Sequence, residues 1–330
     1  MNKTQKIIIN ILVFALIAGF GYYMVYSMTS DERLILSSEG NAEDSLISAY
    51  KKTNNFTVSS DIIGFDIYQN AIYTAQSDRI SVFDLSGEHQ RDFGIKKDVR
   101  DIVVEDDRVY LLYPSEIEVF TLEGEKIAGW TAHRNNSDYC SIALSAAYVF
   151  VTDAENKHIC RYTKEGDFLD IILSPNSFII PSYAFDIINI QDTLYCSNSG
   201  RNRVERFTLE GKYIDSFGKA GSEAGSFAGC CNPTFLAATQ YGDIITSEKG
   251  NPRISCYGRD GKFRTILLGS KMLGGGTNAY CVRVQDDRIY VSGKNTLTVF
   301  VFDPELAEQS ACADCPLECP LKQLSMNNNQ

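Results

Sequence analysis

The amino-acid sequence predicts an all-β fold, a six-bladed β-propeller, preceded by an N-terminal transmembrane helix. Three observations lead to this prediction: a strand phrase that recurs six times, a glycine-containing hairpin that follows five of the copies, and an apolar run near the N-terminus. The expected organisation is an anchor with its cytoplasmic lysines over residues 1–28, a tether over 29–54, the propeller over 55–304 and a cysteine-rich tail over 305–330.

The recurring phrase is a short strand, a tight polar turn, and a second strand that opens with aliphatic and usually aromatic residues. Its six copies are FDIYQNAIYTA, IVVEDDRVYLL, IALSAAYVFVT, IINIQDTLYCS, LAATQYGDIITS and VRVQDDRIYVS. The matching positions are Tyr73, Tyr110, Phe150, Tyr195, Ile245 and Tyr290. These positions are 37, 40, 45, 50 and 45 residues apart, a spacing that fits one four-stranded blade per copy rather than a helical repeat.

A second phrase, which follows each of the first five copies, predicts a hairpin. Its turn glycines are Gly87, Gly124, Gly166, Gly211 and Gly261. A glycine after Ser, Glu or Asp supplies the positive φ that a tight hairpin needs, so each of these units has four strands. The sixth copy stops at Asp303-Pro304, and residues 55–59 are the candidate for its missing outer strand. Closure by an N-terminal strand would remove an exposed sheet edge.

The N-terminal segment predicts a membrane anchor. Lys3 and Lys6 precede an apolar run over residues 7–26, and about 20 apolar residues suffice for a helix to cross the hydrocarbon core. Lysines before the run and acids after it place the N-terminus inside. The expected location is therefore the cytoplasmic membrane, with a single pass and the C-terminal domain on the periplasmic or extracellular side. The alternative is a cleaved signal peptide, which has a shorter apolar core and a small-residue exit.

Composition narrows the class of partner. The hydrophobic fraction of 44% is large enough for a sizeable core, whereas a formal charge of −11 and an isoelectric point near 4.9 leave no broad basic field. No cluster of five to eight Lys and Arg residues occurs in the sequence. We therefore expect no nucleic acid, and instead the membrane through the single helix, together with a protein or small ligand on a propeller face.

One stretch, residues 201–263, resembles the NHL-repeat family. The family pattern is met by Phe217-Gly218, Gly221, Gly225, Phe227, Pro233, Gly242-Asp243 and Asn251-Pro252-Arg253-Ile254. The other repeats keep the strand phrase but lose most of the glycine loop, and the pattern's histidine occurs in blade three as Asn156-Lys157-His158-Ile159. The resemblance implies an NHL-like six-bladed propeller. Such propellers act as extracellular sensor or ligand-binding domains, as protein- or RNA-binding platforms, or in a few branches as metal-dependent lyases or lactonases.

The ten cysteines fall into two groups. Five lie singly in or beside strand phrases, where a small thiol is an ordinary core residue: Cys140, Cys160, Cys196, Cys256 and Cys281. The other five are Cys230 and Cys231 in the glycine-rich loop and Cys312, Cys315 and Cys319 in the tail. The tail spacing, Cys-x2-Cys-x3-Cys-Pro, resembles the latter part of the bacterial ferredoxin run but lacks one cysteine. Cys230 or Cys231 could supply the missing ligand if the tail folds back across the propeller face.

The loop and tail cysteines are accordingly candidate ligands of an iron–sulfur cluster or of zinc, between which the sequence does not decide. A second hypothesis is two or three disulfides that join the tail to the loop in an oxidising compartment. An unpaired or redox-active arrangement is the third. Covalent haem is disfavoured, because neither close pair of tail cysteines is followed by histidine.

No catalytic set of residues is evident. The three histidines, His89, His133 and His158, have no HxxxH or HExxH spacing, and neither a nucleophile elbow nor a phosphate loop occurs. The sequence therefore favours a non-enzymatic binding or scaffold module. The alternatives are a redox-associated accessory protein of a membrane complex and a metal-dependent propeller lyase or lactonase.

Overall fold

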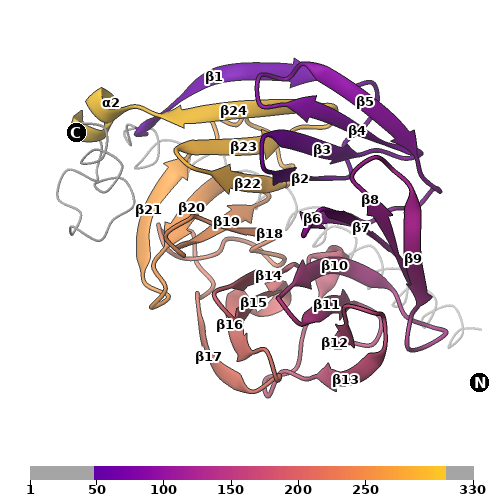
Figure 1. The fold of residues 1–330 in the computed structure, drawn as a ribbon. Coiled ribbons are helices and arrows are strands. Elements are labelled where there is room, and N and C mark those ends of the chain that lie inside the picture. The colour runs from indigo at the N-terminus through magenta and orange to yellow at the C-terminus, as the bar shows by residue number, and fades with distance from the viewer. Residues whose placement is uncertain (1–47, 310–330) are drawn as a thin grey trace, which may run out of the picture. The chain divides into compact units, whose positions relative to one another are not determined.

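The computed structural model describes residues 48–309, which form six four-stranded antiparallel sheets around a central axis (Figure 1). This arrangement confirms the predicted all-β six-bladed propeller. The predicted transmembrane helix, most of the predicted tether and the tail cysteines lie outside the described residues. Between residues 48 and 309, no helix combines the length and the apolar character that a membrane span requires.

Each of the first five blades uses four consecutive strands. Blade 1 contains β2 (Gly64–Tyr68), β3 (Ala71–Ala75), β4 (Arg79–Asp84) and β5 (His89–Gly94). Blade 2 contains β6 (Asp101–Glu105), β7 (Arg108–Tyr113), β8 (Glu116–Thr121) and β9 (Lys126–Thr131). Blade 3 contains β10 (Tyr139–Leu144), β11 (Tyr148–Asp153), β12 (His158–Thr163) and β13 (Phe168–Ile172).

Two short 3-10 helices interrupt the second half of the ring. Blade 4 contains β14 (Ile187–Ile190), β15 (Thr193–Asn198), β16 (Arg203–Thr208) and β17 (Tyr213–Phe217), with η2 (Pro181–Tyr183) before it and η3 (Ser199–Arg201) within it. Blade 5 contains β18 (Phe235–Ala238), β19 (Ile244–Glu248), β20 (Arg253–Tyr257) and β21 (Phe263–Leu268). Blade 6 contains β22 (Val282–Gln285), β23 (Arg288–Ser292), β24 (Thr296–Phe302) and β1 (Tyr50–Thr57), and α2 (Pro304–Gln309) follows it.

The six repeated positions of the sequence all lie in the second strand of a blade. All six side chains are buried, with exposed fractions of 4% or less: Tyr73, Tyr110, Phe150, Tyr195, Ile245 and Tyr290. They belong to apolar clusters such as the one that joins blades 1 and 2. The repeat is thus the signature of side chains that fill the spaces between blades.

The turn glycines have a second role beyond their backbone conformation. Gly166 has a φ of +100°, and a β-carbon added to it would lie 2.7 Å from the ring of Trp130 on the outer strand of the preceding blade. Gly87 has the same relation to Phe56 on β1, where the distance would be 2.6 Å. Each turn glycine therefore makes room for a side chain of the neighbouring blade, and β1 takes part in this pattern as the outer strand of blade 6.

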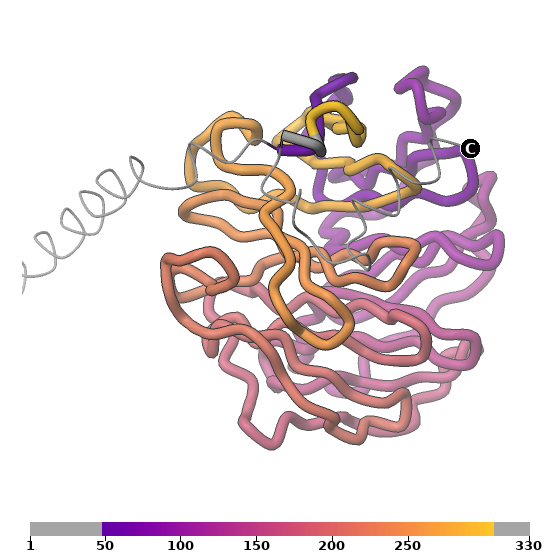
Figure 2. Tube along the Cα trace, turned by 90° about the vertical axis from the view of Figure 1, so that its left-hand side faces the viewer, coloured from indigo at the N-terminus to yellow at the C-terminus, as the bar shows by residue number. Residues whose placement is uncertain are grey.

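The ring is closed by pairing the N-terminal strand with the last one. β1 runs antiparallel to β24 from the pair Tyr50 and Phe302 to the pair Thr57 and Thr296 (Figures 1 and 2). The strand begins at Tyr50, five residues before the segment that the sequence offered for it. Tyr50 is buried and its ring packs edge-on against Phe302, with 5.7 Å between centroids, which explains why the strand extends into the predicted tether.

Candidate functional site

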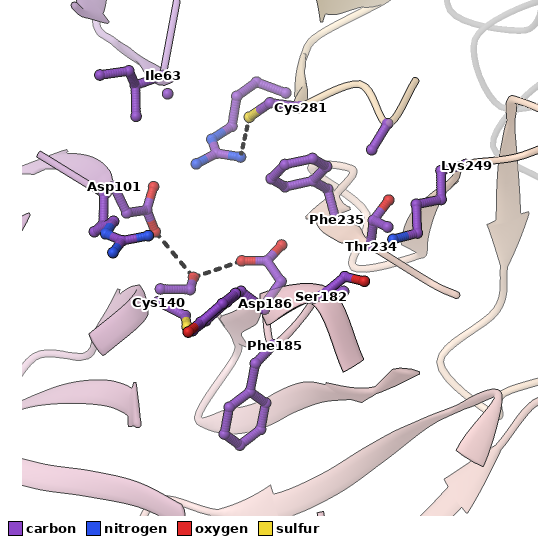
Figure 3. Close-up of a pocket in the computed structure, with 17 residues that line it drawn as sticks. Ile63, Asp101, Cys140, Ser182, Phe185, Asp186, Thr234, Phe235, Lys249 and Cys281 are labelled. Atoms are coloured by element: carbon purple, nitrogen blue, oxygen red, sulfur yellow. Dashed lines mark hydrogen bonds between the residues drawn. The ribbon is translucent and has the colours of Figure 1, made fainter. Parts of the chain in front are cut away.

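One face of the propeller carries all six links between consecutive blades; we call it the loop face. These links are residues 58–63, 95–100, 132–138, 173–186, 218–234 and 269–281. A cavity opens at the centre of this face and is lined by residues of all six blades (Figure 3). We call it the channel pocket. It encloses about 670 Å³ of empty space, part of which is open solvent.

The floor of the channel pocket is formed by the first strand of each blade. Six equivalent residues, each immediately before a buried apolar residue, ring the axis: Gly64, Asp101, Ser141, Asp186, Phe235 and Cys281. Alternation along a strand points one residue into the core between blades and the next toward the axis. A second cavity on the opposite face shares Asp101, Ser141, Asp186 and Arg283 with the channel pocket, so these side chains lie between the two cavities.

Three aspartates near the axis have a structural role that explains their position. The innermost strand of a blade has an unpaired edge, and each aspartate accepts a hydrogen bond from a backbone N–H of the next blade. The distances are 2.8 Å from Val104 N to Asp66, 3.0 Å from Ile142 N to Asp101, and 2.6 Å from Leu236 N to Asp186. The acids therefore connect neighbouring blades around the channel.

A serine joins two of these acids. The hydroxyl of Ser141 lies 2.5 Å from a carboxylate oxygen of Asp186 and 3.0 Å from one of Asp101, although it has a single proton to donate. Burial raises the pKa of Asp101 to about 6, and the charge of Asp186 adds to this rise while Arg283 opposes it. A protonated Asp101 can donate to Ser141, which then donates to Asp186, so the geometry and the pKa agree.

The raised pKa predicts a pH-dependent effect of Asp101→Asn. Between about pH 4 and pH 6 the folded chain retains a proton that the unfolded chain has lost, so the stability contributed by this group falls as the pH rises. Asparagine does not titrate, so its contribution to stability does not change over this pH range. The melting temperature of the variant relative to the natural chain should therefore be higher at about pH 7.5 than at about pH 4.5 in thermal unfolding. The exposed Asp78→Asn is the control; an equal pH trend in both variants would contradict the assignment.

Basic and aromatic side chains form the rim of the channel pocket. Ser182 and Tyr183 both have a φ of +57°, the left-handed backbone conformation that non-glycine residues adopt uncommonly. Tyr183 is 59% exposed, and the Arg100 guanidinium lies 5.9 Å from the centre of its ring. Lys249 enters from blade 5, and its ammonium makes neither an ion pair nor a hydrogen bond with another residue between 48 and 309.

Two of the five predicted cysteine ligands lie beside this rim. Cys230 is exposed and Cys231 is buried in the link between β17 and β18, with 3.0 Å between the two sulfur atoms. The Ser182 hydroxyl lies 3.9 Å from the sulfur of Cys231. The neighbouring thiol of Cys231 and burial raise the pKa of Cys230, whereas the ammonium of Lys249 opposes this rise.

The remaining predicted ligands, Cys312, Cys315 and Cys319, lie outside the described residues. The five-cysteine ligand set for an iron–sulfur cluster or zinc therefore stays a prediction. Of the single cysteines, Cys160, Cys196, Cys256 and Cys281 are buried, and Cys140 and Cys281 also line the channel pocket.

Sequence reasoning missed the channel residues Asp101, Asp186 and Arg283. A signal for them exists, because Asp101 and Asp186 immediately precede the first buried apolar residue of an inner strand, and Arg283 immediately follows the first one of β22. The histidines, by contrast, are absent from the lining of both channel cavities. His89 contacts Asp92, His133 stacks on Phe168, and His158 is buried within blade 3.

Comparison with known proteins identifies the fold. No protein-family model matches the sequence, and no curated protein matches it. Virginiamycin B lyase from Staphylococcus aureus superposes with a TM-score of 0.52 and 14% identity over 76% of this chain and 99% of its own. A streptogramin B lyase gives a TM-score of 0.55 with 14% identity over 78% and 99%. A Bacteroides thetaiotaomicron protein of unknown function gives 0.55 with 12% identity over 78% and 75%. At these identities the likeness extends to the propeller fold alone.

Proposed function

We propose that this chain is a membrane-anchored, extracytoplasmic binding propeller of the NHL type, whose channel pocket takes a small organic anion with an apolar body. The observation that carries the proposal is the ammonium of Lys249 at the rim of a largely apolar pocket, without an ionic partner between residues 48 and 309.

The walls and floor support an organic rather than an inorganic anion. Ile63, Phe235 and Ala184 supply apolar surface on three sides of the channel pocket, and Tyr183 offers an exposed ring at the rim. The floor carries two acids, Asp101 and Asp186, against one cation, Arg283, so its net negative charge disfavours a deeply placed anion. The ligand would therefore place its apolar part against the walls and its anionic group at Lys249.

Lys249→Gln should weaken binding of the aromatic anion anilinonaphthalene sulfonate by about tenfold, since a charge-assisted hydrogen bond contributes about 1.5–3 kcal/mol. Binding of the uncharged N-phenylnaphthylamine should be unchanged. Both are measured by fluorescence titration. The control is Lys262→Gln on an exposed hairpin turn, which should leave both affinities unaltered. An equal loss for the charged and uncharged probes, or no loss for either, would reject the anion site.

A lyase is the second candidate, favoured by the likeness to the two streptogramin-type lyases. A solved structure of the Staphylococcus aureus enzyme with quinupristin carries a histidine-to-alanine substitution and is described as catalytically inactive. Here the residues that line the two channel cavities include no histidine. We therefore expect no conversion of quinupristin when it is incubated with the purified chain and a divalent metal. Turnover in that assay would replace the binding proposal by the lyase.

The anchor and the redox hypothesis have their own tests. The apolar run over residues 7–26 supports the anchor, and recovery of the full chain in the soluble fraction after cell lysis would contradict it. The adjacent thiols of Cys230 and Cys231 favour the alternative of a redox-associated accessory protein. Iron, sulfide and zinc analysis after anaerobic purification would decide that alternative, and a colourless, metal-free chain with all five thiols oxidised would reject it.

A further inference from the structure

Blade 3 contains a buried group of three metal-binding residue types, away from the channel pocket. Asp153 ends β11 and pairs directly with His158, the first residue of β12, while Cys160 lies two residues further along β12. This register puts all three side chains on the same face of the sheet. One ligand atom of each lies within 4.8 Å of those of the other two, and none of the side chains is more than 2% exposed.

The imidazole of His158 lacks a hydrogen-bond partner at one nitrogen. Its Nε2 is buried without a hydrogen bond and lies 4.0 Å from the nearest carboxylate oxygen of Asp153. A buried polar atom left in this state costs about 1–3 kcal/mol. The unsatisfied nitrogen points to a missing bonding partner between the imidazole and the carboxylate.

Blade 5 shows what the same positions look like when they are satisfied within the chain. There the corresponding pair is Glu248 and Arg253, which are joined by ionic hydrogen bonds of 2.6 and 3.1 Å. The third position, occupied in blade 3 by Cys160, is Ser255 in blade 5. The side chains of Asp153 and His158 are shorter than those of Glu248 and Arg253, and they do not form a hydrogen bond with each other. A thiol, that of Cys160, lies beside them in blade 3.

The three donors suit one class of ion. Carboxylate, imidazole and thiolate are all zinc ligands, and a tetrahedral zinc site with three protein ligands has a fourth position for another group such as water. The hydroxyl of Tyr139 lies 3.9 Å from the sulfur of Cys160. One carboxylate and one thiolate balance the two positive charges of the ion, so the buried assembly is neutral.

We propose that Asp153, His158 and Cys160 form a zinc site inside blade 3, separate from the channel pocket and from the cysteines of the loop and tail. On binding, the thiol of Cys160 loses its proton to solvent and the sulfur forms a bond to the ion, with no change of oxidation state. The ion bridges the second and third strands, and its role is to hold blade 3 together. Ligand atoms would move inward by about 1 Å to reach the spacing of a tetrahedral zinc site.

Cobalt(II) titration of the full chain, purified in detergent, tests the site. The five cysteines that the sequence offers as metal ligands could also bind cobalt, so they are replaced by serine in every variant: Cys230, Cys231, Cys312, Cys315 and Cys319. After chelator treatment under reducing conditions, this background chain should bind one equivalent of cobalt with the near-ultraviolet charge-transfer band of a cobalt–thiolate bond. Zinc should abolish the band and raise the melting temperature.

Three additional substitutions assign the ligands. Cys160→Ser should remove the band, and His158→Gln should weaken cobalt binding by at least about tenfold. Cys196→Ser, at a buried single cysteine of blade 4, is the matched control and should keep the band. Circular dichroism establishes that each variant is folded. A folded background chain without the band, or a band that persists in Cys160→Ser, would overturn the proposal.

Discussion

Deletion of residues 50–57 from the full chain is expected to lower the free energy of unfolding by about 5 kcal/mol. These residues are β1, which supplies the outer strand of blade 6 and closes the ring. Tyr50 packs against Phe302, and Phe56 packs against Phe83 with 5.3 Å between ring centroids. Loss of each aromatic contact costs about 1.5–3 kcal/mol, and exposure of the β24 edge adds to that cost. Urea unfolding followed by intrinsic fluorescence measures the change.

The control for this deletion changes the strand without removing it. Lys52→Thr and Asn55→Thr alter exposed positions of β1 and should stay within about 0.5 kcal/mol of the natural chain. The deletion variant should also associate at high concentration, because an unpaired β24 is a template for another chain. An unchanged urea midpoint for the deletion would show that closure by β1 does not stabilise the propeller.

Arg283→Met is expected to lower the free energy of unfolding by about 3 kcal/mol at about pH 7.5. Its guanidinium lies 3.2 Å from Asp66 and is the cation of the channel floor, where Asp101 and Asp186 are also located. Burial raises the pKa of Asp66 and of Asp186, while the charge of Arg283 opposes both rises. Without the guanidinium all three acids become harder to ionise. The cost should therefore shrink at about pH 5, where the acids take up protons.

A second substitution separates this electrostatic effect from lost packing. Combining Arg283→Met with Asp66→Asn removes the partner charge and should recover more than about half of the lost stability. Arg288→Met, at an exposed arginine of the same blade, should change the free energy of unfolding by less than about 0.5 kcal/mol. A cost for Arg283→Met that is the same at both pH values and in both backgrounds would exclude the charge network as its cause.

The repeat could be recognised in the sequence because the strands and turns of each blade depend on nearby residues. The buried position represented by Tyr73 and the turn represented by Gly166 depend on residues within about ten positions, so alternation and turn chemistry suffice to find them. The start of β1 at Tyr50 could not be predicted from the sequence in the same way. The segment from Tyr50 to Thr57 is an outer strand with a mostly exposed polar surface, and its burial depends on β24 at the other end of the chain.

The channel site was beyond sequence reasoning for the opposite reason. Asp101, Ser141 and Asp186 stand 40 to 45 residues apart and belong to no shared motif, yet their side chains share hydrogen bonds. Lys249 follows β19 in a turn, and nothing in the local sequence indicates that it lies at the rim of the channel pocket. In blade 3, the grouping of Asp153, His158 and Cys160 depends on the register of β11 and β12, which the sequence does not state.

The sequence by itself determined the number of blades, the position of the turns and the class of fold, since these follow from local periodicity and turn chemistry. Only the tertiary structure decided which polar side chains meet at the axis, that the closing strand of blade 6 begins at Tyr50, and that Cys230 and Cys231 lie beside the channel pocket. The physical reason is closure of the ring, which brings equivalent positions of different repeats together at the axis. The chemistry there depends on the residue type that each repeat has at that position, and these types vary independently from blade to blade.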